Sequence, residues 1–171
     1  MEDTKDEQTK GIDIGIHSYI VDPTLDANKE DEDGMAPLHR AADNDDIKQM
    51  KKLLAIPGID VNVQIRSGNE ERWTPLHYAA RHGHTKCIKL LLQHADVNVN
   101  AQTAYGVTPL VLAVINGNIE CVRLLLEYKN IQVNIKDNYG DTALAAAEQS
   151  EYNTEQKQEI VSLLIQHGAT K

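Results

Sequence analysis

The sequence contains no Phe and only one Trp, and aromatic residues make up 4% of its 171 positions. Its hydrophobic content of 41% therefore rests almost wholly on Ala, Leu, Ile and Val. Small aliphatic side chains allow short helices to pack closely, whereas a core organised around large rings is excluded. The composition favours a helical core built from short, closely stacked elements.

Long apolar segments and an excess of basic charge are also missing. No apolar run approaches the roughly 18 residues that a membrane-spanning helix needs, and the first ten residues, MEDTKDEQTK, lack the apolar centre of a secretory signal. The net charge is −9, and positions 1–32 carry ten acidic residues against three Lys. Positions 33–171 carry sixteen acidic and fourteen basic residues. We therefore expect neither membrane insertion nor binding to nucleic acid, which requires a basic field.

Cysteine is scarce as well. Cys87 and Cys121 lie 34 positions apart, at equivalent places in two apolar stretches. We expect two buried, reduced thiols that act as small hydrophobic side chains, and no disulfide. This favours a reducing, cytoplasmic location, with the nucleus or delivery into a host cell left open.

The most informative positive feature is a repeated phrase. TPLHYAA begins at Thr74, TPLVLAV at Thr108 and TALAAAE at Thr142, each 34 residues after the one before, and APLHRAA begins at Ala36. A fixed period of this length is typical of a stack of small supersecondary units. The stretch TPLHYAARHGHTKCIKLLLQHADVN and its counterparts resemble the ankyrin repeat over about residues 22–171. The resemblance implies an all-α solenoid of stacked helix-turn-helix units with β-hairpin fingers.

The domain organisation follows from this period. We expect an acidic tail with a capping segment at 1–21 and a repeat domain at 22–171, with repeats at about 33–65, 71–103, 105–137 and 139–171. Positions 12–21 fit either a helix, with Ile12, Ile16, Tyr19 and Ile20 on one face, or a strand, with Ile12, Ile14 and Ile16 alternating. A helix that covers the first repeat is favoured, because end repeats need a cover for their apolar face. For the acidic segment a solvated tail is favoured over a cover for the groove or a docking motif.

Local signals place the helices within each unit. Thr74 and Thr108 are expected to cap first helices whose first turn begins with Pro, and Gly83 and Gly117 to end them. Repeat one has Asn44 and Asp45 where repeats two and three have Gly. Four additional residues precede Trp73, and about five more lengthen the second half of repeat four.

The side chains that could bind a metal or take part in catalysis are better explained by structural roles. His82, His84 and Cys87 suggest a metal site, but no fourth ligand occurs at zinc spacing. The resemblance implies that His39 and His77 form hydrogen bonds between adjacent units. Asn62, Asn98 and Asn134 are expected to bond within their own fingers, and in this family such residues can be hydroxylated. No arrangement of nucleophile, acid and base is visible, so we expect no enzyme activity, cofactor, metal or catalytic residue.

The resemblance implies a protein-binding module whose concave groove holds a partner. An effector or regulatory subunit that inhibits or targets an enzyme through the same surface is the alternative, ahead of a structural spacer or an enzyme. The expected state is a monomer that binds another protein of unknown identity. The candidate partner-binding residues are Trp73, Tyr78, Arg81, Tyr105, Leu112, Ile115, Tyr139 and Arg40. Leu112 and Ile115 are included as apolar side chains expected to be exposed.

Overall fold

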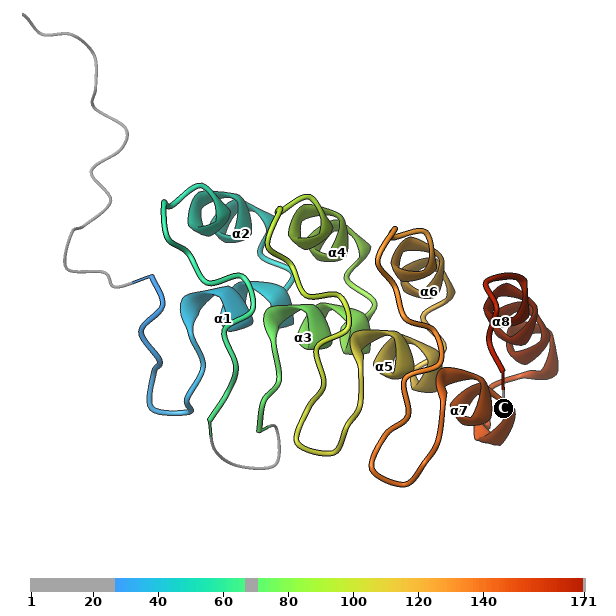
Figure 1. Ribbon diagram of the computed structural model, residues 1–171. Coiled ribbons are helices and arrows are strands. Elements are labelled where there is room, and N and C mark those ends of the chain that lie inside the picture. Colours follow the sequence, from blue (N-terminus) through green and yellow to red (C-terminus); the bar gives the residue numbers. More distant parts are fainter. Residues whose placement is uncertain (1–26, 67–70, 171) are drawn as a thin grey trace, which may run out of the picture.

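The computed structural model describes residues 27–66 and 71–170. Its eight helices form four consecutive pairs within these ranges (Figure 1). The helices are α1 (Pro37–Asp43), α2 (Ile47–Leu54), α3 (Pro75–His82), α4 (Thr85–Leu92), α5 (Pro109–Ile115), α6 (Ile119–Leu126), α7 (Ala143–Gln149) and α8 (Thr154–Gln166). The expected capping segment at 12–21 and the acidic tail lie outside the described residues.

The pairs stack side by side into two layers (Figure 1). The inner layer contains α1, α3, α5 and α7, and the outer layer contains α2, α4, α6 and α8. Each helix packs against its partner and against the equivalent helices of its neighbours, so one aliphatic core runs along the stack. This arrangement is the all-α solenoid that the 34-residue period predicts.

The helix ends follow the local signals in the sequence. The Thr108 and Thr142 hydroxyls accept hydrogen bonds from the amides of Val111 and Ala145, and so cap α5 and α7. The Thr74 hydroxyl instead lies 2.8 Å from Nδ1 of His77. Gly83 ends α3 with φ +77°, a left-handed conformation that costs glycine little.

Repeat four differs from the others in its outer helix. α8 has 13 residues, whereas α2, α4 and α6 have eight each. Asn153 caps α8 by accepting from the amide of Gln156. The extra residues found in the sequence therefore lengthen both this helix and the loop before it.

The loops between helix pairs, here called fingers, project from the inner layer on the side away from the outer helices (Figure 1). Within the described residues they contain turns and no assigned strand. Backbone bonds still close them in hairpin fashion, for example from the Thr103 amide to the Val107 carbonyl oxygen at 3.0 Å. The Asp137 carboxylate accepts from the amides of Tyr139 and Asp141 inside its finger, and the Thr103 hydroxyl makes equivalent bonds in the preceding one.

Candidate functional site

The fingers of repeats three and four present two exposed aromatic side chains. Tyr139 is 82% exposed and Tyr105 is 50% exposed. Their backbones are held firmly, because the Tyr139 amide donates to the Asp137 carboxylate and the Asn138 amide donates to the carbonyl oxygen of Tyr105 at 3.0 Å. The two rings are therefore carried on loops that are tied to each other.

The inner helices contribute an apolar and a cationic side chain. Ile115, the last residue of α5, is 49% exposed, and Arg81 near the end of α3 is also exposed. The Arg81 guanidinium lies over the Trp73 ring, 5.4 Å from its centre. Together with the two finger tyrosines, these residues define what we call the finger–helix surface: Arg81, Tyr105, Ile115 and Tyr139.

Three other candidate residues are buried, which corrects the sequence prediction. Trp73 is only 9% exposed, Tyr78 is 2% exposed and Leu112 is 9% exposed. The Trp73 and Tyr78 rings pack with their centres 5.2 Å apart, and His39 meets Tyr78 edge-on at 5.9 Å. These three side chains therefore support the stack, and they offer a partner little area in this conformation.

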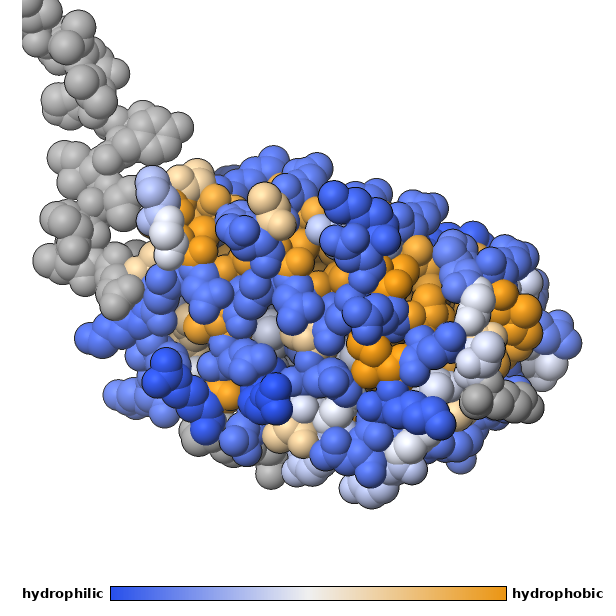
Figure 2. Space-filling view, viewed as in Figure 1, coloured by the Kyte–Doolittle hydropathy of each residue, from blue (hydrophilic) through white to orange (hydrophobic). Residues whose placement is uncertain are grey.

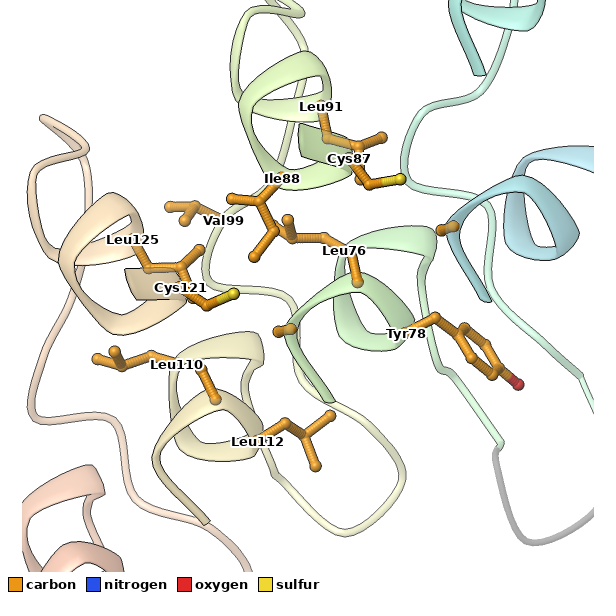
Figure 3. Packing of buried hydrophobic residues seen from close by; sticks show 14 of the residues in the cluster. Leu76, Tyr78, Cys87, Ile88, Leu91, Val99, Leu110, Leu112, Cys121 and Leu125 are labelled. Atoms are coloured by element: carbon orange, nitrogen blue, oxygen red, sulfur yellow. The ribbon is translucent and has the colours of Figure 1, made fainter. Parts of the chain in front are cut away.

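The position of Tyr78 and Leu112 on their helices explains the error. Each is the second residue after the Thr-Pro-Leu phrase, and each projects toward the preceding repeat (Figure 3). Both belong to the continuous core. The sequence pattern identifies a side of the helix, but only the stacking decides whether a neighbouring repeat covers it.

Arg40 occupies the same position in the first described repeat and is half-exposed. Its Nε donates to the Asp31 carboxylate at 2.8 Å, and its guanidinium also pairs with Asp33. The hydrogen bond from Arg40 is the main reason that the pKa of Asp31 lies below its usual value. The hydrogen bonds to Asp31 and Asp33 in turn raise the pKa of Arg40. The charge of Arg40 is thus already neutralised by its own finger.

The candidate metal ligands are engaged in other interactions. Nε2 of His82 lies 3.0 Å from the Asp43 carboxylate, and Nε2 of His84 donates to the backbone carbonyl oxygen of Asp43. Cys87 is buried with its thiol directed at Asp45. Among the described residues, no group of three or more metal-ligating side chains lies close enough together to hold an ion.

Both cysteines are free and buried, as the sequence predicts. Burial raises the pKa of Cys87 to about 12, with the carboxylate of Asp45 adding to the effect. Burial likewise raises the pKa of Cys121 to about 11. Both groups therefore stay protonated near neutral pH, so neither forms the thiolate that nucleophilic chemistry needs.

Two buried histidines connect successive repeats, as expected. In each, Nδ1 accepts from a backbone amide three residues earlier and Nε2 donates to a carbonyl oxygen in the next finger. His39 reaches Trp73 at 3.0 Å and His77 reaches Val107 at 3.1 Å. Since both partners of each ring are fixed backbone groups, the neutral Nε2–H form is required.

The face of the molecule seen in Figure 2 carries mainly polar and charged residues, with apolar residues in separate patches between them. In the described part of the chain, no helix combines the length and the apolar character needed to cross a bilayer.

The structure thus consists of helix pairs joined by closed fingers and by histidine hydrogen bonds between repeats. Comparison with known proteins identifies this type of repeat. The family model described as ankyrin repeats in three copies matches residues 15–103, 38–137 and 96–171. The chain belongs to the ankyrin-repeat family. Ankyrin repeats are generally protein-interaction modules, and members of the family are typically non-enzymatic.

A solved structure supports the same assignment. The chain is similar to an ankyrin repeat protein described as EF0377, with 32% sequence identity and a TM-score of 0.76. The similarity covers 86% of this chain and 71% of that one. No curated protein sequence matches this chain.

One set of ankyrin-finger residues was assigned only partly from the sequence. Four Asn side chains each bind the loop of the following repeat through two hydrogen bonds, accepting from one backbone amide and donating to a carbonyl oxygen two residues earlier. We call this pair of hydrogen bonds the Asn bracket. They are Asn28, Asn62, Asn100 and Asn134. The sequence prediction chose Asn98 instead of Asn100, and it placed the bonds within one finger instead of between fingers. The distance to the next repeated phrase, eight residues for Asn28, Asn100 and Asn134, is the sequence signal that distinguishes Asn100 from Asn98.

Proposed function

We propose that this ankyrin-repeat chain binds another protein through its finger–helix surface, centred on Tyr105, Ile115 and Tyr139. One observation carries the proposal. Within the described residues, four large hydrophobic side chains are exposed, and three of them are these residues. The fourth, Ile165, lies on the outer helix α8. Two of the three lie on adjacent fingers that are bonded to each other and the third ends the inner helix α5, and exposed apolar side chains on neighbouring elements favour an interaction site.

The chemistry of these residues supports binding to a protein. Tyr offers a large apolar ring and a hydroxyl while losing little conformational entropy, and Tyr and Arg are enriched among residues that dominate binding energy. Arg81 provides the cation, held above Trp73. A partner with an apolar anchor and an acidic or carbonyl group would match this combination.

The rigidity of the fingers favours binding further. The loops of Tyr105 and Tyr139 are closed by bonds to Thr103 and Asp137 and are joined by the bond from Asn138 to Tyr105. A surface that is already ordered avoids part of the entropy that association otherwise costs. The proposed mechanism is therefore binding to a preformed surface by a monomer in a reducing compartment, with no chemical step.

The test compares two sets of exposed residues. Tyr105→Ala/Tyr139→Ala removes the finger rings, and Ile165→Ala is the control because it removes an equally exposed apolar side chain from the outer layer. Partners are first captured from lysate and identified by mass spectrometry, and their affinities are then measured with purified protein. We expect the double variant to lose about 2 kcal/mol or more of binding free energy while the control retains it.

The circular dichroism spectrum of each variant confirms that it is folded. Equal binding by all three proteins would contradict the proposal, because it would assign the interaction to another surface. Loss of binding in the Ile165→Ala variant alone would move the site to the outer layer.

A further inference from the structure

Arg72 has a backbone conformation that disfavours its residue type. Its φ angle is +64°, in the left-handed region. The equivalent residue in each of the other three fingers, two positions before the repeated phrase, is a glycine with a φ angle between +76° and +89°: Gly34, Gly106 and Gly140. Glycine adopts such an angle readily, whereas any side chain strains the backbone there. Repeat two therefore carries a charged side chain where glycine would be more favourable.

The described chain contains one other residue of this kind, Asp45, whose φ angle is +52°. Its side chain has a partner inside the fold, because the carboxylate accepts a hydrogen bond from the Cys87 thiol at 3.3 Å. Aspartate is also among the residues that adopt the left-handed conformation most often. A contact within the protein thus accounts for the strained residue at position 45.

No such contact accounts for Arg72. The four other arginines all interact with acidic or aromatic side chains: Arg40 with Asp31 and Asp33, Arg66 with Glu30, Arg81 with Trp73, and Arg123 with Glu159. The Arg72 side chain is exposed, and none of the ion pairs within residues 27–66 and 71–170 includes it. The exposed Glu71 beside it forms no ion pair with it either.

The backbone around Arg72 is fixed by hydrogen bonds that do not require its side chain. The Arg72 amide donates to the carbonyl oxygen of Ile65 at 2.6 Å, and the Ile65 amide donates to the carbonyl oxygen of Trp73 at 3.0 Å. The Trp73 oxygen also accepts from Nε2 of His39 at 3.0 Å. Glycine at position 72 would keep all three bonds. The fold therefore holds Arg72 in place without using its guanidinium group.

Arg72 adjoins the finger–helix surface. The Ala104 amide donates at 3.0 Å to the carbonyl oxygen of Glu71, the residue before Arg72. The bond from the next finger to the carbonyl oxygen of Tyr105 is the equivalent contact one repeat further along. The fingers of repeats two, three and four are therefore joined in series, and Arg72 extends the row of exposed residues that contains Tyr105 and Tyr139.

We propose that Arg72 binds a carboxylate in an acidic segment of the partner protein, next to an apolar residue of that segment that contacts Tyr105 and Tyr139. This inference rests on the proposed function, because it adds a charge-selective contact to the finger–helix surface. A guanidinium group binds a carboxylate through two parallel hydrogen bonds, which provides specificity as well as attraction. The partner thus supplies the interaction that the side chain does not have within its own chain. A backbone strained at one residue is typical of positions used for binding.

The test uses peptides as probes. A phage-displayed library of random peptides is selected on the full chain, and the selected peptide is synthesised for affinity measurements. We expect selected peptides to combine Asp or Glu with an apolar residue. Arg72→Gly should weaken binding of the synthetic peptide at least tenfold, and Arg72→Lys should weaken it less, because lysine keeps the charge but not the paired geometry. A peptide with its acidic residue changed to Lys should bind Arg72→Glu more tightly than wild type.

Urea unfolding shows whether Arg72 serves the fold instead. We expect Arg72→Gly to have a urea midpoint equal to or above that of wild type, because glycine relieves the strain and keeps the backbone bonds. A lower midpoint would overturn the proposal. A library that gives no binding peptide, or only peptides without an acidic residue, would overturn it as well.

The double variant Tyr105→Ala/Tyr139→Ala separates this inference from the proposed function. If that variant loses the peptide while Arg72→Gly binds it as wild type does, the role of Arg72 is wrong and the finger–helix surface stands. If Arg72→Gly loses the peptide and the double variant retains it, the contact of Arg72 stands and the tyrosines are not the centre of the site.

Discussion

Nε2 of His77 lies 3.1 Å from the carbonyl oxygen of Val107, so a neutral imidazole joins the inner helix of repeat two to the finger of repeat three. The ring is fully buried. Its Nδ1 accepts from the amide of Thr74, which leaves no site for a second proton. This bond makes contact between repeats depend on the protonation state of one side chain.

The first prediction is that stability falls in mild acid. Burial lowers the pKa of His77 from 6.5 to about 4. The unfolded chain therefore binds a proton that the folded chain excludes, and the stabilisation present above pH 6.5 is lost as the pH falls toward 4. Since one pKa unit corresponds to about 1.4 kcal/mol, the loss is ~3 kcal/mol.

Urea unfolding of the wild type and of His77→Gln between pH 7.5 and 4.5 measures this contribution. We expect His77→Gln to be less stable at pH 7.5 and to depend less steeply on pH. Identical slopes for the two proteins would show that groups other than His77 control the acid response.

The second prediction concerns Trp73, which the sequence suggested as an exposed anchor. Because its ring is buried against Tyr78 and beneath Arg81, Trp73→Ala should lower the free energy of unfolding by about 3 kcal/mol. Tyr139→Ala should change it by less than about 0.5 kcal/mol, because that ring is exposed. Chemical denaturation followed by circular dichroism compares the two variants. A stable Trp73→Ala protein would return Trp73 to the list of binding residues.

The third prediction compares two glycines to separate the cost of a positive φ angle from the cost of steric contact with a neighbouring side chain. Gly83 and Gly58 have similar positive φ angles of +77° and +80°. A Cβ at Gly83 would lie 2.9 Å from Oδ1 of Asn118, whose amide group donates to two carbonyl oxygens of α3, whereas a Cβ at Gly58 would meet no atom within 4 Å. Gly58→Ala should therefore cost about 1 kcal/mol and Gly83→Ala about 2 kcal/mol or more.

Thermal or urea unfolding of both glycine variants provides the measurement. Equal losses would mean that Asn118 moves aside freely and that only the φ angle matters.

The fourth prediction tests the bracket between fingers. The side chain of Asn100 bonds to the carbonyl oxygen of Asn130 and the amide of Gln132, while the side-chain oxygen of Asn98 accepts from the nearby amide of Asn100. Asn100→Ala removes two contacts between repeats, so it should lower the free energy of unfolding by about 1–2 kcal/mol. Asn98→Ala should cost roughly half as much or less. A larger loss for Asn98 in urea unfolding would contradict the assignment of the bracket.

Much of the architecture could be predicted because the relevant signals are local. The Thr-Pro pairs determine where the helices at Thr74 and Thr108 begin, and the 34-residue interval between equivalent phrases determines the number of units. The bonds of His39 and His77 were also predicted correctly from the family phrase. Each of these features depends on residues close together in the chain or on the repeat period itself.

The exposure of individual side chains could not be predicted in the same way. Tyr78 and Leu112 share one helix position with Arg40, yet the first two are buried and the third is half-exposed. The same limit applies to the Asn residues, since Asn98 and Asn100 both follow Val and only one spans the gap to the next finger.

The sequence by itself determined the ankyrin-repeat period, the helix starts and turns, and the aliphatic composition of the core, because these depend on backbone preference and on a regular apolar pattern. Only the tertiary structure decided which side chains remain available to a partner. Burial depends on what packs opposite each residue in the folded stack: Trp73 is covered by Tyr78 and Arg81 of its own repeat, while Tyr78 and Leu112 project toward the preceding repeat.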